Sequence, residues 1–313
     1  MDTLGADHAM TLLGRARNTM RMFFSSTSLG GALLPLWQSS ILNEKVSLIF
    51  FRREQRKALA NGGAEVEISN TYFKMSLDMR EMRDFLLYEI MRNETGYYEP
   101  ETTILLTKHL HEGSVFLDIG ANNGYFTLLA SKLVGPTGRV LSFEPNPSSY
   151  LRLAKNTRTN NIQNVVARQC AVGNMNGLAQ LYLSDYEDGL SSMHRKSGRS
   201  IPVSVCRLDD VQEARDADII KVDVEGYELP VLHGMKEILD SRPNLKMVIE
   251  WNYRFHHATP LLGLLQKRFH VYAIGRSRQK TLALRPVRSH TDLPNTWCNL
   301  WCSKTEETPH EST

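Results

Sequence analysis

Four acidic residues of this sequence stand where mostly apolar, strand-like runs end, and they could bind hydroxyl groups or move protons. Asp118, Glu144, Asp223 and Glu250 each follow such a run. Carboxylates accept hydrogen bonds from hydroxyl groups and can act as general bases. Open α/β sheets bind their ligands at the carboxyl ends of the strands. The pattern therefore predicts a ligand site at that edge of a sheet.

The stretch VFLDIGANNGY, residues 115–125, has the form of a strand that turns into a helix. Gly120 allows a tight turn, and Gly124 is expected to let the following helix approach the strand. Apolar residues recur at helical spacing after Gly124, so the free N–H groups of a helix N-terminus should point at the ligand. These features predict a nucleotide site.

The acids around this turn indicate which nucleotide it binds. Asp118 would repel a phosphate but favour a cationic amino-acid group. Glu144 lies twenty residues after Gly124, at the end of a second short strand, where it can take both ribose hydroxyls. A ligand with a ribose and a positive charge is S-adenosylmethionine. A dinucleotide is the competing ligand, but Asn122 occupies the position where a glycine would admit the pyrophosphate, which argues against NAD.

Strand-like and helix-like segments alternate along the chain and predict a Rossmann-like, doubly wound α/β sheet. After the third strand, Ala171 and Val172 lie where the adenine is expected. We expect a domain that binds S-adenosylmethionine over residues 94–304, a mainly helical extension over 1–93 and a disordered tail over 305–313. The extension could cap the site, mediate homo-oligomerisation or simply pack on the domain.

Composition limits the class of protein. The chain has 313 residues, of which 42% are apolar and 23% charged, as in soluble globular proteins. A net charge of +3 is too small to imply nucleic acid or a membrane surface as partner. Four scattered cysteines and the lack of an export-like start predict a reducing, cytoplasmic location. The most apolar long stretch, residues 28–51, is interrupted by polar residues, so no membrane span is expected.

Five features stand in this order along the chain: DIGANNG (118–124), EPN (144–146), LDD (208–210), KVDVEGYE (221–228) and Glu250. Together they resemble the FkbM family of S-adenosylmethionine-dependent methyltransferases. The resemblance covers roughly residues 94–302, and Asn123 departs from the small apolar residue expected there. It implies methyl transfer to hydroxyl oxygens of sugars and secondary metabolites, and it adds Asn146 to the cofactor residues.

Methyl transfer to a hydroxyl needs little beyond placement and removal of one proton. The acceptor oxygen must lie about 3 Å from the methyl carbon, in line with the sulfur. The proton calls for a general base or a metal ion. Asp223, Glu225 and Glu250 are the candidate catalytic residues. No further metal ligand is evident, so we favour a base without a metal, although Mg²⁺ among the acids is the alternative.

Other assignments stay open at this stage. His256 or His257 could serve as the base, whereas His194 is expected to be a surface residue and Tyr227 to pack in the core. The same scaffold could methylate nitrogen or carbon. A non-catalytic cofactor-binding module that engages a partner through residues 1–93 is the rival from another class. The partner we expect is a small-molecule acceptor.

Overall fold

A computed structural model describes residues 65–81, 97–183, 199–256, 260–277 and 281–307, together with seven isolated positions (56, 60, 84, 87, 88, 91 and 193). The chain divides into two units, one of Met1–Val66 and Leu77–Gly96, the other of Glu67–Ser76 and Tyr97–Thr313. Most of the predicted extension, His194, His257 and the side chain of His256 lie outside the described residues. The architecture below is that of the second unit.

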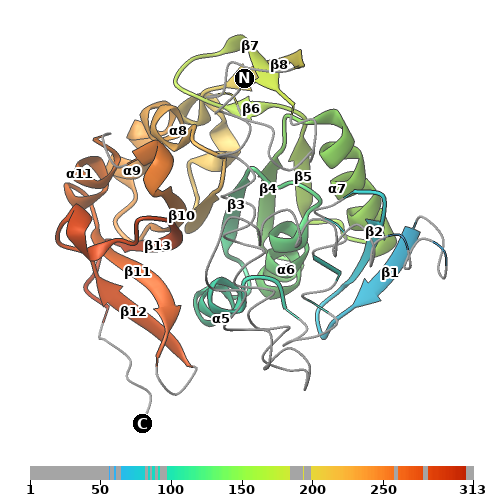
Figure 1. Ribbon diagram of the computed structural model, residues 1–313, viewed down its shortest axis with the longest axis horizontal. Coiled ribbons are helices and arrows are strands. Elements are labelled where there is room, and N and C mark those ends of the chain that lie inside the picture. Colours follow the sequence, from blue (N-terminus) through green and yellow to red (C-terminus); the bar gives the residue numbers. More distant parts are fainter. Residues whose placement is uncertain are drawn as a thin grey trace, which may run out of the picture. The chain divides into compact units, whose positions relative to one another are not determined.

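A single large sheet organises this unit (Figure 1). Its strand order is β12-β11-β13-β10-β9-β3-β4-β5. The middle strands run parallel and the edge beyond β10 is antiparallel. The parallel strands are β5 (Val165–Arg168), β4 (Arg139–Phe143), β3 (Val115–Ile119), β9 (Ile219–Val222) and β10 (Lys246–Asn252), and the antiparallel ones are β13 (Trp297–Ser303), β11 (His270–Arg276) and β12 (Leu282–Pro286).

The strand order reverses at β3, which pairs with β4 on one side and with β9 on the other. Such a reversal opens a crevice at the carboxyl ends of the two strands, where doubly wound folds bind their ligands. Every residue of β3 and of β9 is buried, as expected for strands covered on both faces. The predicted Rossmann-like fold is therefore confirmed.

Helices connect the parallel strands. Because β-α-β crossovers are right-handed, α6 and α7 cover one face and the helices after β9 cover the other. Helix α5 packs against α6 and lies beside it in Figure 1. No helix among the described residues is long and apolar enough to cross a membrane. The helices are α5 (Pro100–His109), α6 (Tyr125–Val134), α7 (Pro147–Thr159), α8 (Glu228–Gly234), α9 (Lys236–Ser241), α10 (Tyr253–His256) and α11 (Leu261–Gln266).

Two smaller sheets accompany the large one. In one of them, β7 (Gly177–Tyr182) and β8 (Ser200–Cys206) pair antiparallel. β6 (Ala171–Val172) joins the other side of β8. In the other, β1 (Glu65–Ser69) and β2 (Lys74–Asp78) form a two-stranded sheet.

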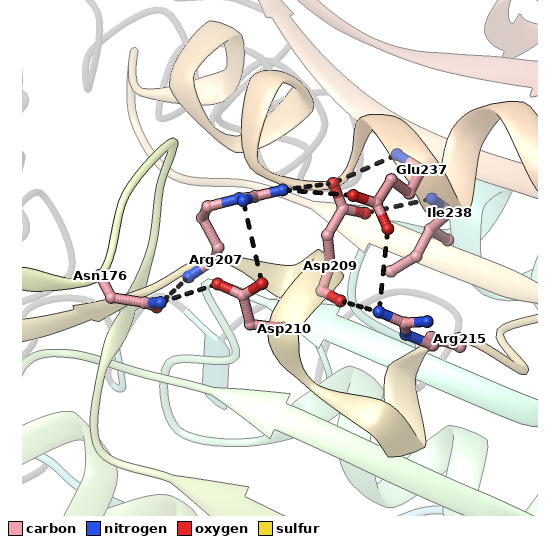
Figure 2. A network of polar contacts seen from close by, with 7 residues as sticks. All are labelled: Asn176, Arg207, Asp209, Asp210, Arg215, Glu237 and Ile238. Carbon is pink, nitrogen blue, oxygen red and sulfur yellow. Dashed lines mark hydrogen bonds and ion pairs between the residues drawn. The ribbon is translucent and has the colours of Figure 1, made fainter.

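The LDD block forms a short 3-10 helix, η2 (Leu208–Asp210), that fastens to α9 (Figure 2). The carboxylate of Asp209 is buried and accepts hydrogen bonds from the backbone N–H groups of Glu237 and Ile238, both at 3.1 Å. Arg207 donates to the same carboxylate at 3.2 Å, and Arg215 donates to the Asp209 carbonyl oxygen at 2.9 Å. Asp209 thus caps the start of α9, so this block holds the fold together.

Replacing Asp209 by alanine should lower the free energy of unfolding by about 2–4 kcal/mol, because two backbone N–H groups lose their capping acceptor. Urea denaturation of the purified variant measures the change. Asp210→Ala is the matched control, since that carboxylate is half exposed and bonds to Asn176 and Arg207 at the surface. Equal losses for the two variants would contradict the capping role.

Candidate active site

The turn between β3 and α6 forms the predicted cofactor end of the site. Gly120 has a φ of 84° and Asn122 a φ of 51°, both left-handed. A Cβ at Gly120 would overlap the carbonyl oxygen of Asp223, so the turn lies directly against the end of β9. Gly124, at φ 95°, caps α6, and a Cβ there would lie 2.6 Å from Leu153 Cδ1. The close approach that Gly124 permits is therefore to α7, rather than to the strand as predicted.

Glu144 ties this turn to the end of β4. One carboxylate oxygen accepts the N–H of Asn122 and the other the N–H of Asn146, each at 2.8 Å. A carboxylate oxygen has two lone pairs, so it can accept a second hydrogen bond, as from a ribose hydroxyl group. The side chain of Asn146 caps α7 by accepting from Ser148 N–H at 2.9 Å. Asn146, rather than Ser148 or Ser149, is therefore the cap of α7. The structure brings three predicted cofactor residues, Asn122, Glu144 and Asn146, into one hydrogen-bonded group.

Asp118 lies deeper than the sequence suggests. It belongs to β3, and its carboxylate accepts a hydrogen bond from Thr127 of α6 at 2.7 Å. Only 1% of the residue is exposed, and this burial raises the pKa of the carboxyl group, against the opposing effect of Lys221. Contact of Asp118 with the cofactor stays a prediction, but the observed partner is a helix side chain.

Ala171 and Val172 form the short strand β6 and are both buried. Gly173, directly after them, donates its N–H to the Cys206 carbonyl oxygen at 3.0 Å. A Cβ on Gly234 would overlap the Gly173 carbonyl oxygen, so α8 packs closely on this segment. Their contact with adenine stays a prediction.

The three predicted catalytic acids do lie together. Carboxylate oxygens of Asp223, Glu225 and Glu250 are within 4.8 Å of one another. Glu250 belongs to β10, and Asp223 and Glu225 to the loop after β9. Glu225 is left-handed at φ 51°. The buried carboxylate of Glu228 accepts the N–H groups of Val224 and Gly226, at 3.2 and 3.3 Å, and so holds this loop in place.

Lys221 is a functional candidate that the prediction missed. Its Nζ lies 3.0 Å from an Asp223 carboxylate oxygen and 4.7 Å from the centroid of the Phe126 ring. Burial disfavours the ammonium ion, but Asp223, Glu99 and Asp118 outweigh that effect and raise the pKa of Lys221 above its ordinary value. Lys221 stands two positions before Asp223, the spacing at which side chains of an extended segment point to the same side, so the KVDVEG block carried this signal.

Glu99 and Asn299 extend the polar group and were also missed. Asn299 of β13 stands directly opposite Glu250 of β10. Its side-chain amide donates to the Glu99 carboxylate at 2.7 Å and to Thr102 Oγ1 at 3.0 Å. Glu99, the residue before α5, is left-handed at φ 43°. No local pattern links Glu99 and Asn299, which are 200 positions apart in the chain.

This arrangement agrees with the comparison to known proteins. Residues 118–272 match the model of the methyltransferase FkbM domain. This part of the chain is an FkbM methyltransferase domain. The match contains the cofactor turn and all three acids of the cluster, so the predicted resemblance is confirmed.

Curated relatives of the FkbM domain have described activities. "Methyltransferase 1" of Beauveria bassiana is 29% identical, over 40% of this chain and 60% of its own. "Hexuronic acid methyltransferase AglP" of Haloferax volcanii is 27% identical, over 49% and 63%. "31-O-demethyl-FK506 methyltransferase FkbM" of Streptomyces tacrolimicus is 27% identical, over 45% and 65%. The chain thus spans less than two thirds of the length of these relatives.

Proposed function

We propose that the protein transfers a methyl group from S-adenosylmethionine to a hydroxyl oxygen of a small molecule, such as a sugar or a secondary metabolite. The observation that carries this proposal is the cluster of Asp223, Glu225 and Glu250 at the carboxyl ends of β9 and β10. Gly120 of the cofactor turn touches the backbone of the first of these acids. A methyl donor and a proton acceptor would therefore be neighbours. The name of one relative, which acts on a 31-O-demethyl compound, supports a hydroxyl acceptor, and the name of another specifies a sugar acid as its substrate.

The residues at the turn suit this cofactor. The carboxylate of Glu144 can accept hydrogen bonds from ribose hydroxyl groups, whereas its charge would repel a pyrophosphate. Asn122 has its N–H committed to Glu144, so the turn does not offer that group to a phosphate. When bound, S-adenosylmethionine supplies the electrophilic methyl group.

The acid cluster would bind the acceptor and take its proton. We assign Asp223 as the base, because its backbone packs directly against Gly120 of the cofactor turn. Lys221 is ion-paired with it and holds it ionised and oriented, ready to accept a proton. Glu225 and Glu250 would orient the hydroxyl group by accepting hydrogen bonds. Placement of the acceptor oxygen in line with the methyl group supplies most of the rate.

Two rival functions follow from the same geometry. The acid cluster could equally serve methylation of nitrogen or carbon. Mg²⁺ could replace a protein base by binding among the acids. Homo-oligomerisation through residues 1–93, a non-catalytic role for a partner there, and a cytoplasmic location remain predictions from the sequence.

S-adenosylhomocysteine should raise the melting temperature of the protein, whereas NAD should leave it unchanged, because a ligand that binds only the native state stabilises it by mass action.

Glu144→Gln should weaken S-adenosylhomocysteine binding by about tenfold to a hundredfold, as one hydrogen bond to a charged acceptor is lost. Isothermal titration calorimetry measures the affinity. Because Glu144 also holds the turn, some stability should be lost as well.

Glu112→Gln, an exposed change of the same chemistry, is the control for this measurement. Stabilisation by NAD and not by S-adenosylhomocysteine would overturn the proposed function.

A further inference from the structure

A row of polar side chains continues past the reaction centre, away from the cofactor turn. In the sheet, β3 carries the turn, β9 leads to Asp223, β10 carries Glu250 and β13 carries Asn299. Glu250 and Asn299 are direct partners in the antiparallel ladder, so their side chains share one face of the sheet. If the cofactor lies over β3 and β4, the acceptor must approach from the side of β10 and β13.

Glu99 is the last member of this row of polar side chains, next to Asn299. It precedes α5 and stands at the N-cap position, yet its side chain makes no capping hydrogen bond. Its carboxylate instead bonds to the Asn299 amide at 2.7 Å. The Glu99 carboxyl group is also one of the groups that raise the pKa of Lys221.

The groups left for an acceptor here are hydrogen-bond acceptors. The amide nitrogen of Asn299 uses its two hydrogens on Glu99 and Thr102, so its carbonyl oxygen is what it can still offer. An ionised carboxylate such as that of Glu99 accepts hydrogen bonds and donates none. A bound molecule would therefore have to present hydroxyl or ammonium groups.

Carboxyl groups outnumber ammonium groups among the described residues of the row. Glu99, Asp223, Glu225 and Glu250 each supply a carboxyl group, and Lys221 supplies an ammonium group. Glu99 lies on the acceptor side, where it bonds to Asn299. An anionic acceptor would bring its charge against the Glu99 carboxyl group, whereas a neutral or cationic acceptor would not, so repulsion disfavours the anion.

We infer that Glu99 and Asn299 form the acceptor-recognition side of the site and select a neutral or cationic polyol over an acidic sugar. The acceptor presents a second hydroxyl or ammonium group beside the hydroxyl that is methylated. This inference rests on the proposed function for the direction of approach. It sets this chain apart from the relative whose name specifies a hexuronic acid.

The test compares binding of methyl glucoside, glucosamine and methyl glucuronide to the full chain loaded with S-adenosylhomocysteine. Saturation-transfer NMR titrations give each affinity without turnover. The two uncharged or cationic sugars should bind at least about tenfold more tightly than the glucuronide. Glu99→Gln keeps the side-chain volume and an oxygen for Asn299 but removes the charge, so it should reduce that ratio by about tenfold.

Glu101→Gln is the matched control, because this neighbour in α5 is ion-paired with Arg276 rather than with the row. It should leave the ratio unchanged. Equal or tighter binding of the glucuronide, no binding of any of the three sugars, or a ratio that Glu99→Gln does not alter would each overturn the inference. Methyl transfer is followed in parallel with labelled cofactor. Selective binding without any transfer would support the inference while counting against the proposed function alone.

Discussion

Alanine in place of Gly120 should lower the free energy of unfolding by roughly 2–5 kcal/mol and abolish S-adenosylhomocysteine binding. Two effects add. A residue with a Cβ is strained at a φ of 84°, and that Cβ would overlap the carbonyl oxygen of Asp223. Backbone atoms must move apart to relieve the overlap, which separates the cofactor turn from the end of β9. Urea denaturation measures the loss of stability, and calorimetry measures the loss of binding.

Gly263→Ala is the matched control. A Cβ at Gly263, in α11, meets nothing within 4 Å. Alanine in a helix interior is favoured over glycine by roughly 0.5–1 kcal/mol, so this variant should be as stable as the wild type or slightly more so. Normal cofactor binding by Gly120→Ala would show that the contact between turn and strand is dispensable.

Most of the fold could be predicted because its signals are local. The apolar runs at residues 115–119 and 219–222 give strands buried on both faces, and the glycines of the turn mark where β3 gives way to α6. Acids that follow strands converge because parallel strands end at one edge. The proximity of Asp223, Glu225 and Glu250 follows from that rule.

The ends of strands were harder to predict than the strands themselves. Asp118 was expected at the carboxyl end of its strand, but β3 continues to Ile119, and the Asp118 carboxylate bonds to Thr127 of α6. Glu144 was predicted to take both ribose hydroxyl groups; that role stays a prediction, and no sequence pattern indicated that its two oxygens also hold the backbone of Asn122 and Asn146. A strand boundary displaced by one or two residues decides whether a charge faces solvent or a helix.

Partners far apart in the chain could not be predicted at all. Glu99 and Asn299 meet because α5, which follows Glu99, packs against β11, the strand next to β13. Neither residue lies in a periodic pattern that reports the other. Lys221 was within reach of prediction, since it stands two positions before Asp223, but a lysine in a buried strand is easily mistaken for a surface residue.

Asp223→Asn should reduce turnover by about 10²–10⁴-fold while leaving the affinity for S-adenosylhomocysteine nearly unchanged, because it removes a general base and keeps the side-chain shape. The change also takes the ion-pair partner from Lys221, a buried ammonium group, and should cost about 3–5 kcal/mol of stability. The double variant Lys221→Met/Asp223→Asn separates these effects. It should recover much of the stability without recovering turnover.

Removal of metal ions decides whether a protein base or a bound metal ion promotes loss of the acceptor proton. Lys221 already places a positive charge 3.0 Å from an Asp223 carboxylate oxygen, and it would repel a divalent cation bound by the same carboxylate. We therefore expect full activity after exhaustive treatment with EDTA. Glu225→Gln and Glu250→Gln should raise the KM of the acceptor more than they lower kcat, since those acids orient the hydroxyl group without taking its proton. Activity that is lost in EDTA and returns only with added Mg²⁺ would sink the assignment of Asp223 as the base.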